Sequence, residues 1–416
     1  MKRFLLLIFM LSSLSTMAQE LNGDWKGLLK AGPQTLTIII HIDRPSQAVT
    51  MDVVEQGAYS LPTTLNILTT DSISFSIAQL RLKYSGKLKD GKLCGTYQQN
   101  MFMTSLDFEP GKVEMKRPQE PKPPYPYKTE EVLFHNYPAH AMLAGTLTFP
   151  VGYEYGTCEK VPVVVMVSGS GQQNRDEEMF GHKPFLVIAD WLARHGIASL
   201  RYDDRGAGAS IGDYKSCTTA DFYLDAYAAI DMLKRRNEFS SIGIIGHSEG
   251  GAIAYMLGSE GQVDFIVSLA GPACRIDEMM VVQINSLARS QGMTNDIVHT
   301  PEEAYEFIKQ QNGESAWLDY FMNLDMTGYV EKVRCPVLAL GAERDLNVPV
   351  SINVPALKQH LPENPQNIIK VYPELSHLFH HSPTGNPLLA ASIEETISEE
   401  VLKDITEFII KLGIRD

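Results

Sequence analysis

The chain has 416 residues and is acidic, with 36 basic and 50 acidic side chains and a net charge of −14 at pH 7. This balance disfavours nucleic acid and anionic membranes as partners, and no basic stretch overrides it. The chain is long enough to bury a large core, and no segment beyond its N-terminus is long and apolar enough to span a bilayer. No pattern in the sequence indicates an oligomeric state.

Residues 1–18 have the layout of a secretory signal peptide. Lys2 and Arg3 precede an apolar run at 4–11, and small and polar residues follow as far as Ala18. The apolar run is shorter than the roughly 20 residues of a membrane anchor. We expect cleavage after Ala18 and export to the periplasm or the medium. Loss of Lys2 and Arg3 would take the net charge from −14 to −16.

The five cysteines are widely spaced, at positions 94, 158, 217, 274 and 335. An oxidising compartment would allow one or two disulfides, with at least one thiol left over. No Cys-x-x-Cys pair favours zinc or redox chemistry. We therefore expect most of the cysteines to be packing residues.

Residues 19–115 are expected to form a small all-β domain, an antiparallel barrel or sandwich. Short strand-like runs recur there without a helical period, and Asp90-Gly91 is a strong hairpin signal. Trp25 either lines a ligand cavity or fills the end of the barrel, and we favour the second interpretation. Residues 116–128 contain five prolines and are expected to be an extended linker to a second domain.

Residues 129–416 alternate between strand-like and helical patterns. Continuous apolar runs at 161–167, 242–246, 265–270 and 337–340 are typical of strands buried on both faces. The alternation predicts a doubly wound, mostly parallel sheet with helices on both faces. Residues 274–330 break this rhythm and should cap the strand ends. There, Trp317, Tyr320 and Phe321 either line a substrate pocket or form the cap's own core.

Ser248 is the candidate nucleophile. It lies in Gly246-His-Ser248-Glu-Gly250, between an apolar strand and a glycine- and alanine-rich helix, the context in which a serine hydroxyl projects from a tight turn. Ser210 has the same glycine spacing but follows a charged turn, with neither a strand before it nor a helix after it. The context therefore favours Ser248.

A serine nucleophile needs a histidine base and a carboxylate that holds the histidine, in the chain order Ser, Asp or Glu, His. Asp345 follows the run 337–340, at the carboxyl edge of the sheet where such folds bind ligands. Glu343, Asp264 and Asp325 are weaker alternatives. We expect Asp345 to be the carboxylate of the triad.

His377 is the expected base, because it comes first after the strand predicted at 368–372. His380 and His381 are its rivals, and the three together have spacing that metal ligands can show. No His-Glu-x-x-His motif or converging carboxylate supports a metal site, so we expect neither a metal nor an organic cofactor. The oxyanion donors should be the backbone N–H groups of Glu249 and Ser170.

These motifs resemble those of the bacterial α/β-hydrolase family of carboxylesterases with a serine-aminopeptidase-like core. The matching segments are Gly169-Ser-Gly-x-Gln-x-Arg-Asp176, Arg201-Tyr-Asp-x-Arg-Gly-x-Gly-x-Ser210, Gly246-His-Ser-Glu-Gly-Gly251, Gly341-x-x-x-Asp-x-x-Val-Pro349 and Ser376-His-Leu-Phe379. Ser168 departs from the histidine that many relatives have at that position, which leaves the triad intact. The resemblance implies an α/β-hydrolase fold for residues 129–416, preceded by the small all-β barrel-like domain.

The resemblance also implies acyl transfer through a serine ester, with small or medium acyl esters as substrates. A peptidase of the same fold is the first alternative. A binding protein with an inactive hydrolase domain is the second. Cleavage of aminoacyl arylamides would favour the peptidase, and failure of Ser248 to react with a fluorophosphonate would favour the binding protein.

Overall fold

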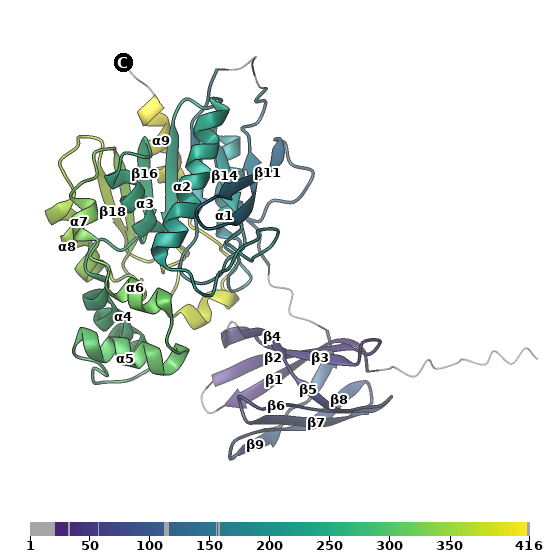
Figure 1. Cartoon of the computed structure of the whole chain (residues 1–416). Helices are drawn as coiled ribbons and strands as arrows, with labels where there is room; N and C mark the ends of the chain where they lie inside the picture. The colour runs from purple at the N-terminus through teal and green to yellow at the C-terminus, as the bar shows by residue number, and fades with distance from the viewer. Residues whose placement is uncertain are drawn as a thin grey trace, which may run out of the picture. The chain divides into compact units, whose positions relative to one another are not determined.

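The computed structural model describes residues 21–413 except 32–33, 57, 112–115, 155 and 157–158. The signal peptide expected at residues 1–18 lies outside the described residues. The chain divides into two compact units, Met1–Glu114 and Met115–Asp416, which are drawn with their elements in Figure 1.

The smaller unit is an antiparallel sheet that curls back toward itself. Its strand order is β4-β3-β2-β1-β10-β8-β7-β6-β5, with β9 paired to β8. Only Thr63 separates β4 from β5, the two ends of this order, so the sheet is a nearly closed barrel, as expected. The elements are β1 Gly23–Ala31, β2 Gln34–Asp43, β3 Ala48–Val53, η1 Val54–Gln56, β4 Ala58–Pro62, β5 Thr64–Leu68, β6 Ser72–Ile77, β7 Leu82–Lys89, β8 Lys92–Gln99, β9 Phe102–Ser105 and β10 Phe108–Pro110.

Two details of this unit follow from its sequence. Asp90 and Gly91 both have positive φ, 48° and 78°, as a two-residue hairpin turn between β7 and β8 requires. Trp25 is buried in the apolar core with Tyr84 and Phe108, and its indole N–H donates to the carbonyl of Asn22. Trp25 therefore packs inside the barrel, which agrees with the favoured interpretation.

The larger unit contains an eight-stranded sheet in the order β11-β12-β14-β13-β15-β16-β17-β18. The first two strands, β11 Thr129–Asn136 and β12 Ala141–Thr148, are antiparallel, and the other six run parallel to one another. Those six are β13 Val163–Val167, β14 Ala198–Tyr202, β15 Ile242–His247, β16 Phe265–Leu269, β17 Val337–Ala342 and β18 Ile368–Tyr372. This confirms the doubly wound, mostly parallel sheet.

Helices cover both faces of the sheet. The chain moves from β13 outward to β14 and then back across to β15, so right-handed crossovers place α1 Pro184–Arg194 and α2 Thr219–Arg236 on opposite faces. The helix α9 Glu399–Gly413 packs against α1, whereas α3 Glu249–Ser259 packs against α2. The remaining helix of the layers is α8 Val350–His360, which packs on β17 and β18.

A helical segment lies between β16 and β17. It consists of α4 Ile276–Ser290, α5 Pro301–Asn312, α6 Ala316–Met322 and the short α7 Thr327–Val330. Thr300 and Ser315 begin α5 and α6 as N-caps, since their hydroxyls accept from backbone N–H groups three residues on. Figure 1 shows α4, α5 and α6 gathered at one end of the larger unit. Ile284, Leu318 and Met322 belong to a small core of their own.

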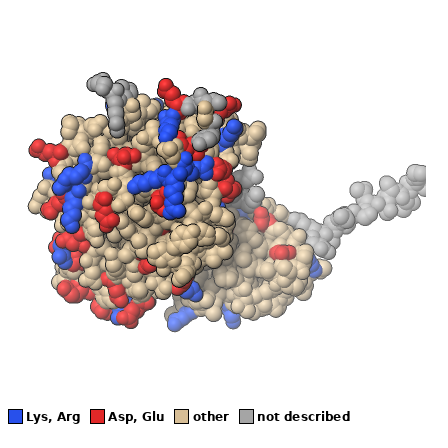
Figure 2. Space-filling model, turned by 45° about the horizontal axis from the view of Figure 1, so that its top comes forward, with Lys and Arg blue, Asp and Glu red and all other residues tan. Residues whose placement is uncertain are grey.

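Several expectations concern the chain as a whole. No helix of the described residues is long and apolar enough to cross a membrane. Cys94, Cys217, Cys274 and Cys335 form no disulfide, and Cys158 lies outside the described residues. On the face shown in Figure 2, basic side chains lie among acidic ones.

Candidate active site

Ser248 occupies the corner between β15 and α3. Its backbone has φ 54° and ψ −119°, a conformation that is strained for a residue with a side chain. Both glycines of the motif are required by close packing. A Cβ on Gly246 would lie 2.0 Å from the carbonyl oxygen of Gly250, and one on Gly250 would lie 2.0 Å from that of Val167. The local sequence thus builds the sharp turn predicted for a nucleophile.

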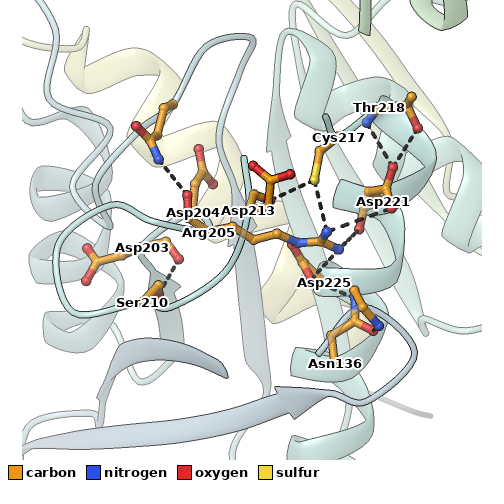
Figure 3. A network of polar contacts seen from close by, with 12 residues as sticks. Asn136, Asp203, Asp204, Arg205, Ser210, Asp213, Cys217, Thr218, Asp221 and Asp225 are labelled. Atoms are coloured by element: carbon orange, nitrogen blue, oxygen red, sulfur yellow. Dashed lines mark hydrogen bonds and ion pairs between the residues drawn. The ribbon is translucent and has the colours of Figure 1, made fainter. Parts of the chain in front are cut away.

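Ser210, with the same glycine spacing, has a structural role. Its buried hydroxyl donates to the carbonyl of Asp203 at 2.7 Å and accepts from the N–H of Ala144 at 2.9 Å. Figure 3 shows the turn that carries it, in which Arg205 points away from Ser210 toward Asp225. The Arg205 guanidinium donates to both carboxylate oxygens of Asp225, at 2.5 and 3.0 Å. This turn is held by buried ion pairing, and its serine is fully engaged.

Asp345 and His377 are brought together at the carboxyl edge of the sheet. Asp345 follows β17, His377 follows β18, and Nδ1 of His377 lies 2.8 Å from Oδ2 of Asp345. The other oxygen, Oδ1, accepts from the N–H groups of Asn347 and Val348, which fixes the carboxylate in its turn. Asp345 is fully buried and His377 is slightly exposed. This is the contact that orients an imidazole for proton transfer through its other nitrogen.

The rival residues have other surroundings. His380 also lines the cavity, but it is buried and stacks on His182, and burial lowers its pKa to about 3. His381 pairs with Glu395 at 2.8 Å on the surface, and Glu343 is exposed. Among the described residues, no group of three or more His, Cys, Asp or Glu side chains is arranged to hold a metal ion.

A cavity of about 450 Å³ opens onto the predicted site residues. Ser248, His377, Ser170 and Glu249 all line it, so four of the five predicted site residues share one cavity and the fifth, Asp345, contacts His377. The helices between β16 and β17 contribute ten apolar side chains to the wall: Met279, Met280, Ile284, Leu287, Phe307, Ile308, Trp317, Leu318, Phe321 and Met322. Seven of them, Met280, Ile284, Phe307, Ile308, Trp317, Leu318 and Met322, also belong to or pack against the small core of this helical segment.

The loop after β13 approaches the nucleophile closely. A Cβ on Gly169 would lie 3.1 Å from the Cβ of Ser248, so Ser170 follows at the cavity wall. Glu249 is the first residue of α3, where backbone N–H groups have no acceptor within the helix. These positions are compatible with the predicted oxyanion donors. Their role stays a prediction.

The carboxylate of Glu249 is buried and already engaged. It accepts from the indole N–H of Trp317 at 2.9 Å and from the hydroxyl of Thr219 at 2.6 Å. Burial raises the pKa of Glu249, although these donors act in the opposite direction. The side chain that follows the nucleophile thus connects α3 to α2 and to α6 of the cap.

Sequence reasoning missed the His247–Glu177 pair. Nδ1 of His247 lies 2.8 Å from Oε1 of Glu177, which also accepts from the N–H of Gly169. Nε2 of His247 donates to the carbonyl of His377 at 3.0 Å. The histidine beside the nucleophile thereby touches both the loop of Ser170 and the loop of the expected base. Its place next to Ser248 was the only available signal.

The segment 174–176 takes part in three ion pairs. Arg175 pairs with Asp203 at 2.7 Å and with Glu131, and Asp176 pairs with Arg201. None of the three residues lines the cavity.

Part of the larger unit matches a known protein family. Residues 183–302 match the family model described as serine aminopeptidase, S33. Esterase EstD of Thermotoga maritima is 24% identical over 278 residues, which cover 65% of this chain and 66% of EstD. An acyl transferase of Photobacterium leiognathi is 32% identical over 88 residues, covering 21% of this chain and 28% of that protein. The matched regions span less than two thirds of either relative.

Solved structures similar to the chain include two esterases. Est1E from Butyrivibrio proteoclasticus has a TM-score of 0.47 and 19% identity, covering 68% of this chain and 99% of Est1E. The esterase Pf2001 of Pyrococcus furiosus has a TM-score of 0.46 and 19% identity, covering 72% of this chain and 99% of that one. The family match and the strand order of the larger unit confirm the expected α/β-hydrolase fold.

Proposed function

Since residues 183–302 match the serine aminopeptidase S33 family within an α/β-hydrolase fold, we propose that this protein is a serine carboxylesterase. The observation that carries the proposal is the cavity onto which Ser248 and His377 open, with Asp345 hydrogen-bonded to His377. Similarity to the esterase EstD supports the same reaction class.

In the proposed mechanism, His377 removes the proton of the Ser248 hydroxyl as its oxygen attacks the ester carbonyl. Asp345 orients the imidazole, and the N–H groups of Ser170 and Glu249 stabilise the negative oxygen. His377 then gives its proton to the departing alcohol, which leaves an acyl ester on Ser248. Water, deprotonated by His377, cleaves that ester and releases the carboxylic acid. No metal or organic cofactor takes part in these steps.

The cavity favours esters with an uncharged, small or medium acyl group. Its volume of about 450 Å³ lies at the lower end of the range for small-molecule sites. Among the described residues, Glu249 is the only Asp, Glu, Lys or Arg that lines it, and its oxygens already accept from Trp317 and Thr219. An aminopeptidase needs a free acidic group to bind the substrate's ammonium, so the cavity favours the esterase over the peptidase.

The test uses nitrophenyl esters of increasing acyl length, aminoacyl arylamides and a fluorophosphonate. We expect ester cleavage well above arylamide cleavage, labelling at Ser248, and loss of both activity and labelling in Ser248→Ala. Labelling mapped to another serine, or full activity of Ser248→Ala, would refute the proposal. Faster cleavage of arylamides would assign a peptidase instead.

We also propose that the protein acts outside the cytoplasm. The support is the sequence of residues 1–18, with its basic start, apolar run and small residue at Ala18. Mass spectrometry of the protein from fractionated cells should find Gln19 at its N-terminus in the exported fraction. An intact Met1 on cytoplasmic protein would contradict export.

A further inference from the structure

Arg117 binds two loops of the larger unit at once. Its Nε and one terminal nitrogen donate to the carbonyls of Gly181 and Phe180, at 2.9 and 3.1 Å. Its terminal nitrogens also donate to the carbonyls of Ala391 and Ile393, at 2.9 and 2.8 Å. One planar guanidinium thus bridges two stretches of backbone that lie more than two hundred residues apart in sequence.

Gln119 continues the contact with the second stretch. Its amide oxygen accepts from the N–H of Thr396 at 2.6 Å and from that of Ile397 at 3.1 Å. Its amide nitrogen donates to the carbonyl of Ile397 at 2.7 Å. Residues 116–128, expected from their prolines to be a linker, therefore begin with two side chains fixed to the larger unit.

Both of the bridged stretches form walls of the catalytic cavity. Met179 and Phe180 of the first stretch line it, and so do Gly385, Asn386, Pro387 and Ala390 of the second. The bonds of Arg117 are made at Phe180 itself and at the residue next to Ala390. A shift in these bonds would therefore move residues that contact a bound substrate.

His182 joins the same two walls from inside. It is fully buried, its Nε2 donates to the carbonyl of Ala390 at 2.9 Å, and its Nδ1 lies 3.1 Å from the hydroxyl of Thr396. Burial, together with the nearby Arg117 charge, lowers the pKa of His182 to about 4, so the ring is neutral at pH 7. A neutral ring donates once and accepts once, which these two contacts satisfy.

The second wall needs such support because it has little regular structure. Between β18 and α9 the described chain forms only the short 3₁₀ helix η2 Pro387–Ser392. The backbone groups of this stretch must find partners outside it, and Arg117, Gln119 and His182 supply partners for those at 390, 391, 393, 396 and 397. The guanidinium of an arginine has five N–H donors and can bind four carbonyls at once, whereas a lysine ammonium has only three donors.

We propose that Arg117 and Gln119 are positioning residues of the active site, which set the separation of the two cavity walls and so the size of ester group accepted. The kinetic part of this proposal rests on the proposed esterase function. The segment that follows the smaller unit in sequence is then part of the substrate site, and a fragment beginning at residue 129 would lack it.

The test compares Arg117→Met, Arg117→Lys and Gln119→Ala in the full chain, with Lys122→Met as a control on an exposed side chain of the same segment. Amide hydrogen exchange of residues 179–182 and 390–397 reports on the walls without requiring activity. We expect faster exchange in both stretches for Arg117→Met, a smaller change for Arg117→Lys, and the wild-type pattern for Lys122→Met. Gln119→Ala should affect the second stretch alone.

The kinetic readout is the ratio of kcat/KM for long and acetyl esters. We expect this ratio to change by about fivefold or more in Arg117→Met, mainly through KM, while kcat for the acetyl ester stays within about twofold of wild type. A general loss of folded protein would lower the apparent kcat/KM for both esters equally, and that result would overturn the proposal. Unchanged amide exchange in both Arg117→Met and Arg117→Lys would also overturn the proposal. If neither Arg117 variant folds, unchanged exchange of the second stretch in Gln119→Ala would overturn it. Absence of ester cleavage by the wild type would refute the proposed function, while the exchange data would still decide whether Arg117 and Gln119 hold the walls.

Discussion

His247 and Glu177 form an enclosed ion pair beside Ser248, with 2.8 Å between Nδ1 and Oε1. Both ring nitrogens of His247 face oxygens that only accept, the Glu177 carboxylate and the His377 carbonyl. Both contacts can be hydrogen bonds at the same time only when the ring carries two protons. Burial by itself would lower the pKa of His247, but the charge of Glu177 and these hydrogen bonds outweigh it, and the pKa is raised.

Glu177→Gln should impair catalysis although the two side chains have nearly the same shape. Without the charge of Glu177 we expect a neutral ring with a single N–H, so that either the amide oxygen or the His377 carbonyl loses its donor. If the amide turns round, the N–H of Gly169 loses its acceptor. Either result moves the Ser170 loop or His377 relative to Ser248. We expect kcat/KM to fall by about 10- to 100-fold, the size of effect that small misplacements produce. The matched control is Glu395→Gln, which disturbs a similar pair with the exposed His381 and should leave kcat/KM unchanged.

The same pair predicts a pH dependence of stability. Because the pKa of His247 is raised above 6.5 on folding, its contribution to the free energy of unfolding is complete below pH 6.5 and is lost as the pH rises through the folded value. The difference in Tm between wild type and Glu177→Gln should therefore be larger at pH 6 than at pH 9. A difference that grew with pH would contradict the assignment of a charged His247.

Asp204 should destabilise the protein at alkaline pH. Its carboxyl group accepts from the N–H of Gln173 and the hydroxyl of Ser168, but burial raises its pKa from 3.8 to about 7. The folded state thus holds a proton that the unfolded chain has already lost, so stability falls as the pH rises from about 4 through 7. An asparagine can keep both contacts without a charge. Asp204→Asn should therefore raise Tm at pH 8 and change it little at pH 4.

The control for Asp204 is an exposed carboxylate in the same region of Figure 3. Asp213 accepts from the hydroxyl of Ser216 and the N–H of Lys215, and these bonds lower its pKa. Asp213→Asn should accordingly lower Tm slightly at pH 8, whereas Asp204→Asn should raise it. Thermal melts of both variants at pH 4, 6 and 8 would test the sign. A stabilisation of Asp204→Asn that was independent of pH would reject the titration of this group.

Some of these relationships could be predicted from sequence and some could not. The parallel sheet, the corner at Ser248 and the loops of Asp345 and His377 follow from local patterns, because strand ends in such a sheet meet at one edge. The partners of Glu177, Trp317 and Arg117 do not. They lie 70, 68 and as many as 276 residues away, and they are chosen by how loops fold back over that edge, for which neither periodicity nor spacing gives a signal.

The linker region illustrates the same limit. The prolines of 116–128 predict an extended backbone, and that region has no helix or strand before β11. Its attachment to the rest of the larger unit depends on backbone carbonyls in the loop 385–397 that have no partner among the described residues of that loop. These carbonyls can be identified only from the folded structure of residues 385–397. Polar side chains in a proline-rich segment are expected to face solvent, yet here Arg117 and Gln119 donate to the backbone carbonyls of Ala391 and Ile397.

Trp317→Phe should weaken the connection between the cap and the nucleophile corner. Phenylalanine keeps the stacking on Phe321, whose ring centre is 5.0 Å away, but cannot donate to the buried Glu249 carboxylate. Leaving this buried acceptor without its donor costs about 1–3 kcal/mol. We expect the resulting shift of the Ser248 corner to lower kcat/KM by about tenfold or more. Trp191→Phe is the matched control, because it removes an indole bond to Thr406 between α1 and α9. It should lower Tm and leave kcat/KM unchanged; equal kinetic effects of the two variants would argue against a role for Trp317.

Asp345→Asn should separate the structural role of this side chain from its role in proton transfer. The amide oxygen can still accept from the N–H groups of Asn347 and Val348, so the turn should persist and Tm should change little. The amide N–H₂ would then face Nδ1 of His377, which requires the ring proton to sit on Nε2. A ring in that form cannot accept the proton of Ser248, and kcat should fall by about 10⁴-fold. Glu343→Gln, exposed two residues earlier in the same loop, should behave as wild type. If Asp345→Asn instead kept a kcat close to that of wild type in a folded protein, another carboxylate would have to orient His377, and the assignment of Asp345 would be wrong.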